Sequence, residues 1–404
     1  MLSQPAYPVL AEVILKPRRA QPFFGGHPWL FSGAIARLVG AANVGDEVVV
    51  RSHEGEFVAR GLFNPNSQIQ VRLYRRDDEP LDDAFWRGRI RTAVSLRRDQ
   101  LSICGPQQAC RVVFSEADGL SGLVVDRFDD WLLVQFGSAA LATRQTALLE
   151  ALRDELQPKG IWLRTEKGLR EAEGWEPTDG LAWGEPPPRP ILITENDLTY
   201  AVDVVEGQKT GFYCDQRDNR RAAARYLAGR RVLDVCCYSG GFTLNALRHG
   251  GAASVTAVDV SAPALELARD NVERNGFSGR VEFEKSDAFK SLERRVAAGE
   301  KWDAVILDPP KLTRHGRGVP EALRGYHSLN RMAVDLLPPG GILVTCSCTG
   351  HVERAQFREV LADVARGTNR EIQILEDRGA GPDHPVNVRC PETGYLKCLI
   401  CTVR

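Results

Sequence analysis

The chain has 404 residues, of which 43% are hydrophobic and 26% charged, and its 52 Lys and Arg residues nearly balance its 53 Asp and Glu residues. This length predicts two or three domains, and the composition excludes a wholly disordered or collagen-like chain. A formal net charge of −1 excludes a histone-like polycation, although one domain can still carry a basic face. No run approaches the ~18 apolar residues of a membrane span, and no signal peptide is evident, so we expect a cytoplasmic protein without a membrane partner.

Residues 1–78 are expected to form a small β-barrel, the first of three domains. Runs typical of strands, such as 45–52 and 69–74, are separated by Gly, Pro and Asn, and no long helical pattern occurs. A basic and aromatic stretch in this segment is suited to contacting phosphates and stacking on bases. Its candidate RNA-binding residues are Lys16, Arg18, Arg19, His27 and Trp29. Alternatively, the aromatic residues close the barrel core and the basic residues are solvated.

Residues 79–188 are expected to form a central α+β domain. A helical pattern at 82–100 precedes strand-like runs at 110–116 and 131–137, and a second helical pattern covers 147–156. The proline-rich run 185–190 then predicts a stiff, extended linker, because consecutive prolines exclude a helix. We place the start of the third domain, residues 189–404, at this run.

The third domain alternates strand-like runs with helical patterns. The apolar runs lie at 231–238, 253–260, 280–287, 302–310 and 341–348. This alternation predicts the α/β class, with a doubly wound, Rossmann-like parallel sheet that binds its ligand at the carboxyl ends of the strands. Two C-terminal runs, 371–379 and 395–404, can supply further strands, one of them antiparallel.

The ten cysteines are few for this length and include the adjacent Cys236 and Cys237, so we expect reduced thiols and no disulfide framework. Cys398 and Cys401 have the spacing of a metal-binding pair. They lie in a strand-like run, however, where residues three apart face opposite sides. Since no second Cys/His pair has ligand spacing, we expect no metal site.

The first strand of the third domain ends in a pattern that indicates a cofactor site. Asp234 precedes Gly240 and Gly241, and the glycine spacing of a dinucleotide fingerprint is absent. A carboxylate at this turn would repel a pyrophosphate and suits an amino-bearing ligand. The two glycines allow the backbone to approach that ligand closely.

Acidic residues also follow the next two strands. Asp259 is placed to accept both ribose hydroxyls of an adenosine, and Asp287 and Ala288 lie where a polar group can meet the adenine amino group. Each carboxylate could instead be a simple strand-end or helix N-cap group. Three such residues at three consecutive strand ends indicate S-adenosylmethionine, with a nicotinamide dinucleotide as the second choice.

The fourth strand ends in Asp308, followed by two prolines and Lys311. The prolines remove backbone donors and hold a rigid, extended turn, so we expect Asp308 to point into the cleft and bind the edge of a nucleobase. Lys311 is a further candidate for RNA contact. The alternative is a proline-rich strand exit without a ligand.

The fifth strand ends near Cys346 and Cys348, and a thiol over the cleft suggests nucleophilic catalysis. Addition of a thiolate to carbon 6 of a pyrimidine makes carbon 5 able to attack an electrophilic methyl group. Strand alternation puts both thiols on the same face, and Cys348 lies farther toward the open end. We therefore choose Cys348 as the nucleophile, although buried structural cysteines are common.

Several of these motifs together resemble the RlmI-type family of bacterial class I methyltransferases, which form 5-methylcytosine in large-subunit ribosomal RNA. The resemblance rests on LDVCCYSGGF at 233–242, LDPPK at 307–311, SCTG at 347–350, EGQKTGFYCDQRDNR at 206–220 and DHP at 383–385. The run GGHPWLFSGAI at 25–35 is similar to the family's N-terminal PUA domain, an RNA-binding barrel. The resemblance covers essentially the whole chain.

This resemblance implies further site residues. The segment at 206–217 is similar to the one that packs over the cofactor, and the implied cofactor-binding residues are Gln216, Arg217, Arg220, Tyr238, Ser239 and Phe242. The family's S-C-S motif falls on Cys348 but ends here in Thr349. Cys346 matches the T-C-S motif of other cytosine-5 RNA methyltransferases, so both thiols stay candidates.

The leading hypothesis is an RNA cytosine-5 methyltransferase that uses S-adenosylmethionine and acts on ribosomal RNA or a pre-ribosomal particle. The resemblance also allows a homodimer. One alternative is methylation of another RNA atom, such as a guanine nitrogen, with both thiols structural. Another is a non-catalytic RNA-binding protein that retains a methyltransferase fold.

Overall fold

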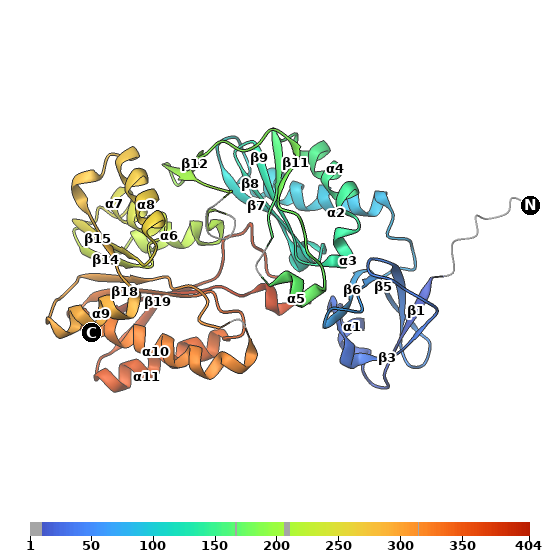
Figure 1. Cartoon of the computed structure of the whole chain (residues 1–404). Helices are drawn as coiled ribbons and strands as arrows, with labels where there is room; N and C mark the ends of the chain where they lie inside the picture. Colours follow the sequence, from blue (N-terminus) through green and yellow to red (C-terminus); the bar gives the residue numbers. More distant parts are fainter. Residues whose placement is uncertain (1–9, 166–167, 206–210, 314) are drawn as a thin grey trace, which may run out of the picture. The chain divides into compact units, whose positions relative to one another are not determined.

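The structure, a computed structural model, describes residues 10–165, 168–205, 211–313 and 315–404. They form two compact units, each built from discontinuous parts of the chain (Figure 1). The first unit contains the described parts of Met1–Arg189, Val204–Thr210 and Asp383–Thr393, and the second those of Pro190–Asp203, Gly211–Pro382 and Gly394–Arg404. Within the described ranges, no helix has both the length and the apolar character needed to cross a membrane. The division into three domains stays a prediction.

The first unit begins with a six-stranded sheet in the order β2-β6-β5-β4-β1-β3. Its elements are β1 (Ala11–Leu15), α1 (Gln21–Phe24), β2 (Trp29–Phe31), β3 (Ile35–Val39), β4 (Glu47–Arg51), β5 (Phe57–Phe63) and β6 (Ile69–Arg75). Apolar side chains such as Val13, Leu30 and Val50 are fully buried in its core. The strand-rich character predicted for this segment is confirmed.

The same unit continues with a five-stranded sheet in the order β11-β10-β9-β8-β7 and its helices. The elements are α2 (Asp83–Ser95), β7 (Ala109–Phe114), β8 (Leu123–Phe128), β9 (Trp131–Phe136), α3 (Ala139–Ala142), α4 (Gln145–Leu156), β10 (Gly160–Leu163), α5 (Leu169–Glu173) and β11 (Gly180–Gly184). Asp82 caps α2 by accepting from the Phe85 N–H. Trp86 of α2 is fully buried and shares one core with Tyr74 of β6.

One expectation about the cysteines is wrong. Cys104 and Cys110 form a disulfide, with their Cα atoms 5.7 Å apart. The chain turns at residues 106–107, just before β7, and Cys110 is the second residue of that strand. The turn brings together two thiols that are six residues apart in sequence. The other eight cysteines all lie within the described residues, and none of them forms a disulfide.

The second unit contains a hairpin, β12 (Ile191–Glu195) and β13 (Leu198–Val202), and a seven-stranded sheet in the order β16-β15-β14-β17-β18-β20-β19. The strands of this sheet are β14 (Arg231–Val235), β15 (Ser254–Asp259), β16 (Val281–Lys285), β17 (Ala304–Leu307), β18 (Gly341–Ser347), β19 (Ile372–Arg378) and β20 (Lys397–Val403). Strands β14 to β18 are parallel, and β20 inserts antiparallel between β18 and β19. The predicted doubly wound α/β sheet is confirmed.

Helices cover both faces of this sheet, with α6, α7 and α8 on one side and α9, α10 and α11 on the other (Figure 1). They are α6 (Arg217–Ala224), α7 (Gly241–Arg248), α8 (Ala262–Arg274), α9 (Ala288–Ala297), α10 (Val319–Leu336) and α11 (Arg354–Thr368). Val232 and Leu233 of β14 are both fully buried but belong to different core clusters. Burial on both faces explains why the strands have continuous apolar runs.

Candidate cofactor and catalytic site

The chain order of the sheet reverses at β14, which has β15 on one side and β17 on the other. Such a switch point leaves a crevice at the carboxyl ends of the strands, where α/β folds bind ligands. The turn after β14 has left-handed backbone at Cys236 (φ 66°), Tyr238 (φ 48°) and Gly240 (φ 80°). Positive φ at two residues with side chains is strained backbone of the kind that clusters at functional sites.

Asp234 of β14 lies beneath this turn and is fully buried. One carboxylate oxygen, Oδ2, accepts a 2.6 Å hydrogen bond from the Thr243 hydroxyl of α7. The other, Oδ1, has no hydrogen-bond partner among the described residues. Burial raises the pKa of Asp234 to about 6. An unsatisfied carboxylate beside a glycine turn can accept from an amino or other donor group of a cofactor, and this role of Asp234 stays a prediction.

Asp259 ends β15 and connects this strand to the turn. Its two oxygens accept from the backbone N–H groups of Tyr238, at 3.0 Å, and Ser261, at 2.9 Å. The carboxylate therefore fixes the turn while each oxygen keeps a further lone pair. Its predicted role toward ribose stays a prediction.

Asp287 follows β16 and caps α9, whose first residue is Ala288. Its carboxylate accepts from the N–H groups of Phe289 and Lys290, and its side chain is exposed. The helix-cap alternative is thus what the structure contains. The predicted contact with adenine stays a prediction.

Arg220 of α6 lies directly behind the glycine turn. A Cβ on Gly241 would lie 2.5 Å from its Nε atom. The guanidinium donates to Glu195 at 2.6 Å and to the Tyr213 carbonyl at 2.8 Å, and it is buried. Arg220, predicted from the resemblance to bind the cofactor, therefore has a protein carboxylate as its partner. The Nε atom of Arg217 lies 3.9 Å from Oε2 of the same Glu195.

The remaining predicted cofactor residues are also in this unit. Ser239 and Phe242 are buried, and the Ser239 carbonyl accepts from Asn271 of α8 at 3.1 Å. The Tyr238 hydroxyl donates to the Gly211 carbonyl at 2.9 Å. The part of the motif at 206–210 lies outside the described residues.

Asp308 follows β17 at the same edge of the sheet and is half-buried. Its Oδ1 accepts a 3.0 Å hydrogen bond from Gln216, whose own side-chain oxygen accepts from Asn219 at 2.7 Å. Burial, and then the nearby charge of Asp215, raise the pKa of Asp308 to about 7. Its carboxyl can thus hold or release a proton near neutral pH.

The two candidate thiols have different surroundings. Cys346 is fully buried and lies opposite Cys398 in the β18–β20 register. Interaction with the Cys398 side chain and burial raise the pKa of Cys346 well above its ordinary value. Cys348 comes just after β18 and is half-buried, with its sulfur 3.8 Å from the Pro309 carbonyl oxygen.

The sequence interpretation missed Lys397, the first residue of β20. Its Nζ is buried and donates to the carbonyls of Thr349 and Tyr395, both at 2.8 Å. Burial lowers its pKa to about 8, an effect that the adjacent Cys348 partly opposes. A lysine inside the apolar run 395–403 was the available signal, because lysine is rarely buried without a partner or a function.

The predicted RNA-binding residues comprise four exposed cations and two aromatic residues with contacts inside the first unit, His27 and Trp29. Lys16, Arg18 and Arg19 are exposed after β1, and Lys311 is exposed in the second unit. His27 lies 3.4 Å from Glu392, and its Nδ1 accepts from the Trp29 backbone N–H.

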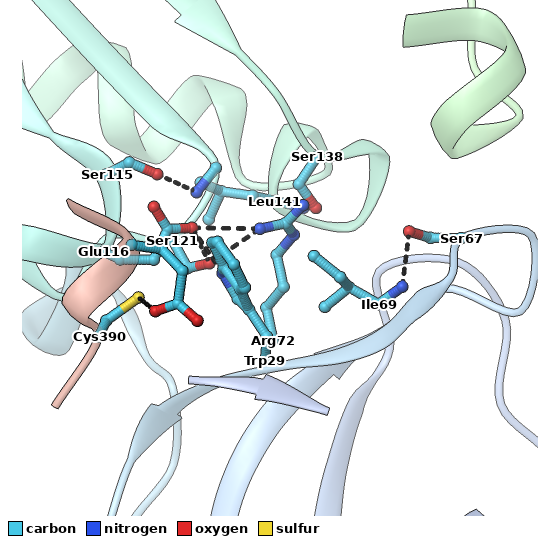
Figure 2. A network of polar contacts seen from close by, with 12 residues as sticks. Trp29, Ser67, Ile69, Arg72, Ser115, Glu116, Ser121, Ser138, Leu141 and Cys390 are labelled. Carbon is cyan, nitrogen blue, oxygen red and sulfur yellow. Dashed lines mark hydrogen bonds and ion pairs between the residues drawn. The ribbon is translucent and has the colours of Figure 1, made fainter. Parts of the chain in front are cut away.

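Trp29 belongs to a polar network in the first unit (Figure 2). Its indole N–H donates to Glu116 at 2.8 Å, and the same carboxylate accepts from Ser121 and pairs with Arg72. Trp29 thus has a structural contact, and its predicted contact with bases stays a prediction.

Comparisons with known proteins agree with these features. Residues 130–392 match the family model of S-adenosylmethionine-dependent methyltransferases, and residues 13–76 match that of PUA-like domains. The predicted cofactor, S-adenosylmethionine, is thereby confirmed. A SAM-dependent methyltransferase structure from Streptococcus mutans superposes with a TM-score of 0.83 at 19% identity, covering 97% of this chain and 99% of that one, which supports the fold. Another solved methyltransferase, complexed with SAH, gives the same values.

Two curated relatives are similar over nearly their whole length. "Ribosomal RNA large subunit methyltransferase I" of Erwinia tasmaniensis is 40% identical over 97% of this chain and 99% of its own. The protein of that name from Photobacterium profundum is 41% identical over 94% of this chain and 96% of its own. The chain therefore belongs to the ribosomal RNA large subunit methyltransferase I family of S-adenosylmethionine-dependent methyltransferases with a PUA-like domain.

Proposed function

We propose that this chain methylates carbon 5 of a cytosine in large-subunit ribosomal RNA, with Cys348 as the nucleophile. The names of the curated relatives support ribosomal RNA as the substrate. The observation that carries the cytosine-5 assignment is the position of Cys348. Its half-buried sulfur lies at the carboxyl edge of the sheet, 3.8 Å from the carbonyl oxygen of Pro309, the residue after Asp308.

In the proposed reaction, the Cys348 thiolate adds to carbon 6 of the cytosine, and the displaced electron pair makes carbon 5 nucleophilic. Bound S-adenosylmethionine supplies the electrophilic methyl group. A base then removes the proton from carbon 5, and the electron pair re-forms the 5,6 double bond as the sulfur leaves carbon 6 as a thiolate. The full burial of Cys346 against Cys398 favours Cys348 for this role.

Two neighbouring groups support this chemistry. With a pKa of about 7, Asp308 can donate a proton or hydrogen bond to the ring nitrogen of the base while the adduct forms. Lys397 places a buried cation next to Cys348, which favours the thiolate over the thiol. In this proposal, Asp308 touches the substrate and Lys397 is a positioning residue.

We further propose that the first unit holds the RNA through the exposed cations Lys16, Arg18 and Arg19, with Lys311 contacting RNA beside the catalytic site. None of these four side chains is ion-paired with a carboxylate of the described ranges, so each can pair with a phosphate without breaking such a contact. His27 and Trp29 complete the proposed RNA surface as members of the motif that resembles a PUA domain.

The test compares Cys348→Ala with Cys346→Ala on large-subunit ribosomal RNA transcripts. Cys348→Ala should abolish methylation while calorimetry still detects binding of S-adenosylmethionine, and nucleoside mass spectrometry should find 5-methylcytosine with the unchanged protein. RNA containing 5-fluorocytidine should trap a covalent adduct with the unchanged protein and not with Cys348→Ala, because fluorine cannot leave carbon 5 as a proton does. An active Cys348→Ala protein would refute the nucleophile. A methylated guanine would refute the cytosine assignment.

A further inference from the structure

The first unit contains a hollow of about 370 Å³ that no part of the proposed function uses. It is bordered by the segment after α1, the end of β6, helix α2 and the loop at 383–393. Three arginines from different segments line it: Arg76, Arg89 and Arg389.

None of the three arginines forms an ion pair with a carboxylate within the described part of the chain. Arg76 donates to the backbone carbonyls of Phe23, at 2.5 Å, and Gly26, at 2.7 Å. Arg89 donates to the Tyr74 carbonyl at 3.2 Å. Burial lowers the pKa of both Arg76 and Arg89, and the like charge of Arg389 contributes to the change at Arg76.

The carboxylates at the rim of the hollow are already neutralised. Asp118 pairs with the fully buried Arg97 at 2.5 Å. Glu116 pairs with Arg72 and accepts from Trp29 and Ser121, as Figure 2 shows. Asp77, which attracts Arg89 from nearby, is itself paired with Arg75. Among the described residues, Arg76, Arg89 and Arg389 therefore have no ion-paired carboxylate of their own, and they give the hollow a net positive charge.

Two glycines make room for the guanidinium side chains. A Cβ on Gly26 (φ 98°) would lie 2.5 Å from Cδ of Arg389, and one on Gly119 (φ 68°) would lie 3.1 Å from an Nη atom of Arg89. Both positions have positive φ, which favours glycine. Glycine at these two positions thus leaves space for the side chains of Arg389 and Arg89, and a residue with a Cβ would displace them.

We propose that this hollow binds a phosphodiester group of the RNA, held by the guanidinium groups of Arg76, Arg89 and Arg389. Arginine presents a planar set of donors that matches phosphate oxygens, and uncompensated arginines gain most from an anion. An RNA strand is favoured over a free anion because the same unit exposes Lys16, Arg18 and Arg19, which can follow further phosphates. This inference rests on the proposed RNA substrate.

The test measures binding of the full chain to a large-subunit ribosomal RNA transcript at several salt concentrations. Arg389→Gln is the main variant because Arg389 is exposed, and Arg89→Gln is the second. Loss of one phosphate contact should weaken binding about five- to eightfold at 0.1 M salt and reduce the slope of log K against log salt by about 0.7 to 0.9. Arg389→Lys should recover part of this loss, and affinity for S-adenosylmethionine should stay the same.

Arg91→Gln is the matched control. Arg91 lies on α2 like Arg89, but it is paired with Glu155 and does not line the hollow. Unchanged RNA affinity and slope in both Arg389→Gln and Arg89→Gln would overturn the inference. If inorganic phosphate stabilises the unchanged protein against heat but not Arg389→Gln, while RNA binding is equal in both, the hollow takes a free anion and the RNA assignment is wrong. Methylation of the transcript by the unchanged protein tests the proposed function separately.

Discussion

Asp308→Asn should stabilise the second unit at neutral and alkaline pH while it abolishes methylation. The pKa of Asp308 is raised from 3.8 to about 7, so the folded state holds a proton that the unfolded chain releases. The protonated Asp308 carboxyl therefore contributes its full stabilisation of the folded state below about pH 4, and this contribution is lost as the pH rises through about 7. A pKa difference of roughly three corresponds to about 4 kcal/mol, and because the side chain is half-buried, access of water should reduce this to about 2 kcal/mol.

Asparagine retains the Oδ1 acceptor for Gln216 and removes only the charge. Hydrogen exchange measured by mass spectrometry over β14 and β17 reports the free energy of opening of this unit apart from the first one. We expect Asp308→Asn to be more stable than the unchanged protein by about 2 kcal/mol at pH 8 and by less than about 0.5 kcal/mol at pH 4. The control is Asp270→Asn, at an exposed position of α8, with no gain at either pH. An equal effect of Asp308→Asn at both pH values would refute the reasoning.

Two other substitutions test neighbouring parts of the site. Lys397→Met removes the buried cation beside the Cys348 thiol. We therefore expect the rising limb of the pH–rate profile to move to higher pH and iodoacetamide to alkylate Cys348 more slowly. An unchanged profile would show that Lys397 has no part in the mechanism. Gly241→Ala should cost about 1–3 kcal/mol in thermal unfolding and weaken binding of S-adenosylmethionine, since the new Cβ would lie 2.5 Å from Nε of the buried Arg220. Gly279→Ala, where an added Cβ meets nothing within 4 Å, is its control, and equal losses in both variants would contradict this account.

The sequence predicted those parts of the site that local pattern encodes. Strand-helix alternation placed Asp234, Asp259 and Asp308 at one edge of the sheet, because carboxyl ends of parallel strands coincide. Strand alternation also placed both thiols near this edge, but burial, which distinguishes Cys346 from Cys348, depends on the pairing of β18 with β20.

Long-range contacts were beyond the same reasoning. Lys397 reaches the site only because β20 inserts next to β18. The pairing of Arg220 with Glu195 depends on how the hairpin β12–β13 packs against α7 and α8. No periodicity in the sequence indicates which arginine has a carboxylate partner and which, like Arg389, has none within the part of the chain that the structure describes.

The discontinuous make-up of the first unit has a consequence for biosynthesis. The buried Arg97 donates to the Asp383 carbonyl at 2.8 Å, the Asp383 carboxylate accepts from the Arg111 N–H, and Asn387 donates to the Glu116 carbonyl. These partners emerge from the ribosome only after strands β14 to β19 have been made, so the N-terminal unit cannot complete its polar contacts while the chain is growing. A chain truncated before Asp383 would leave the buried guanidinium of Arg97 without one of its acceptors, and it would leave the seven-stranded sheet of the second unit without β20. Both units would then be open to proteolysis.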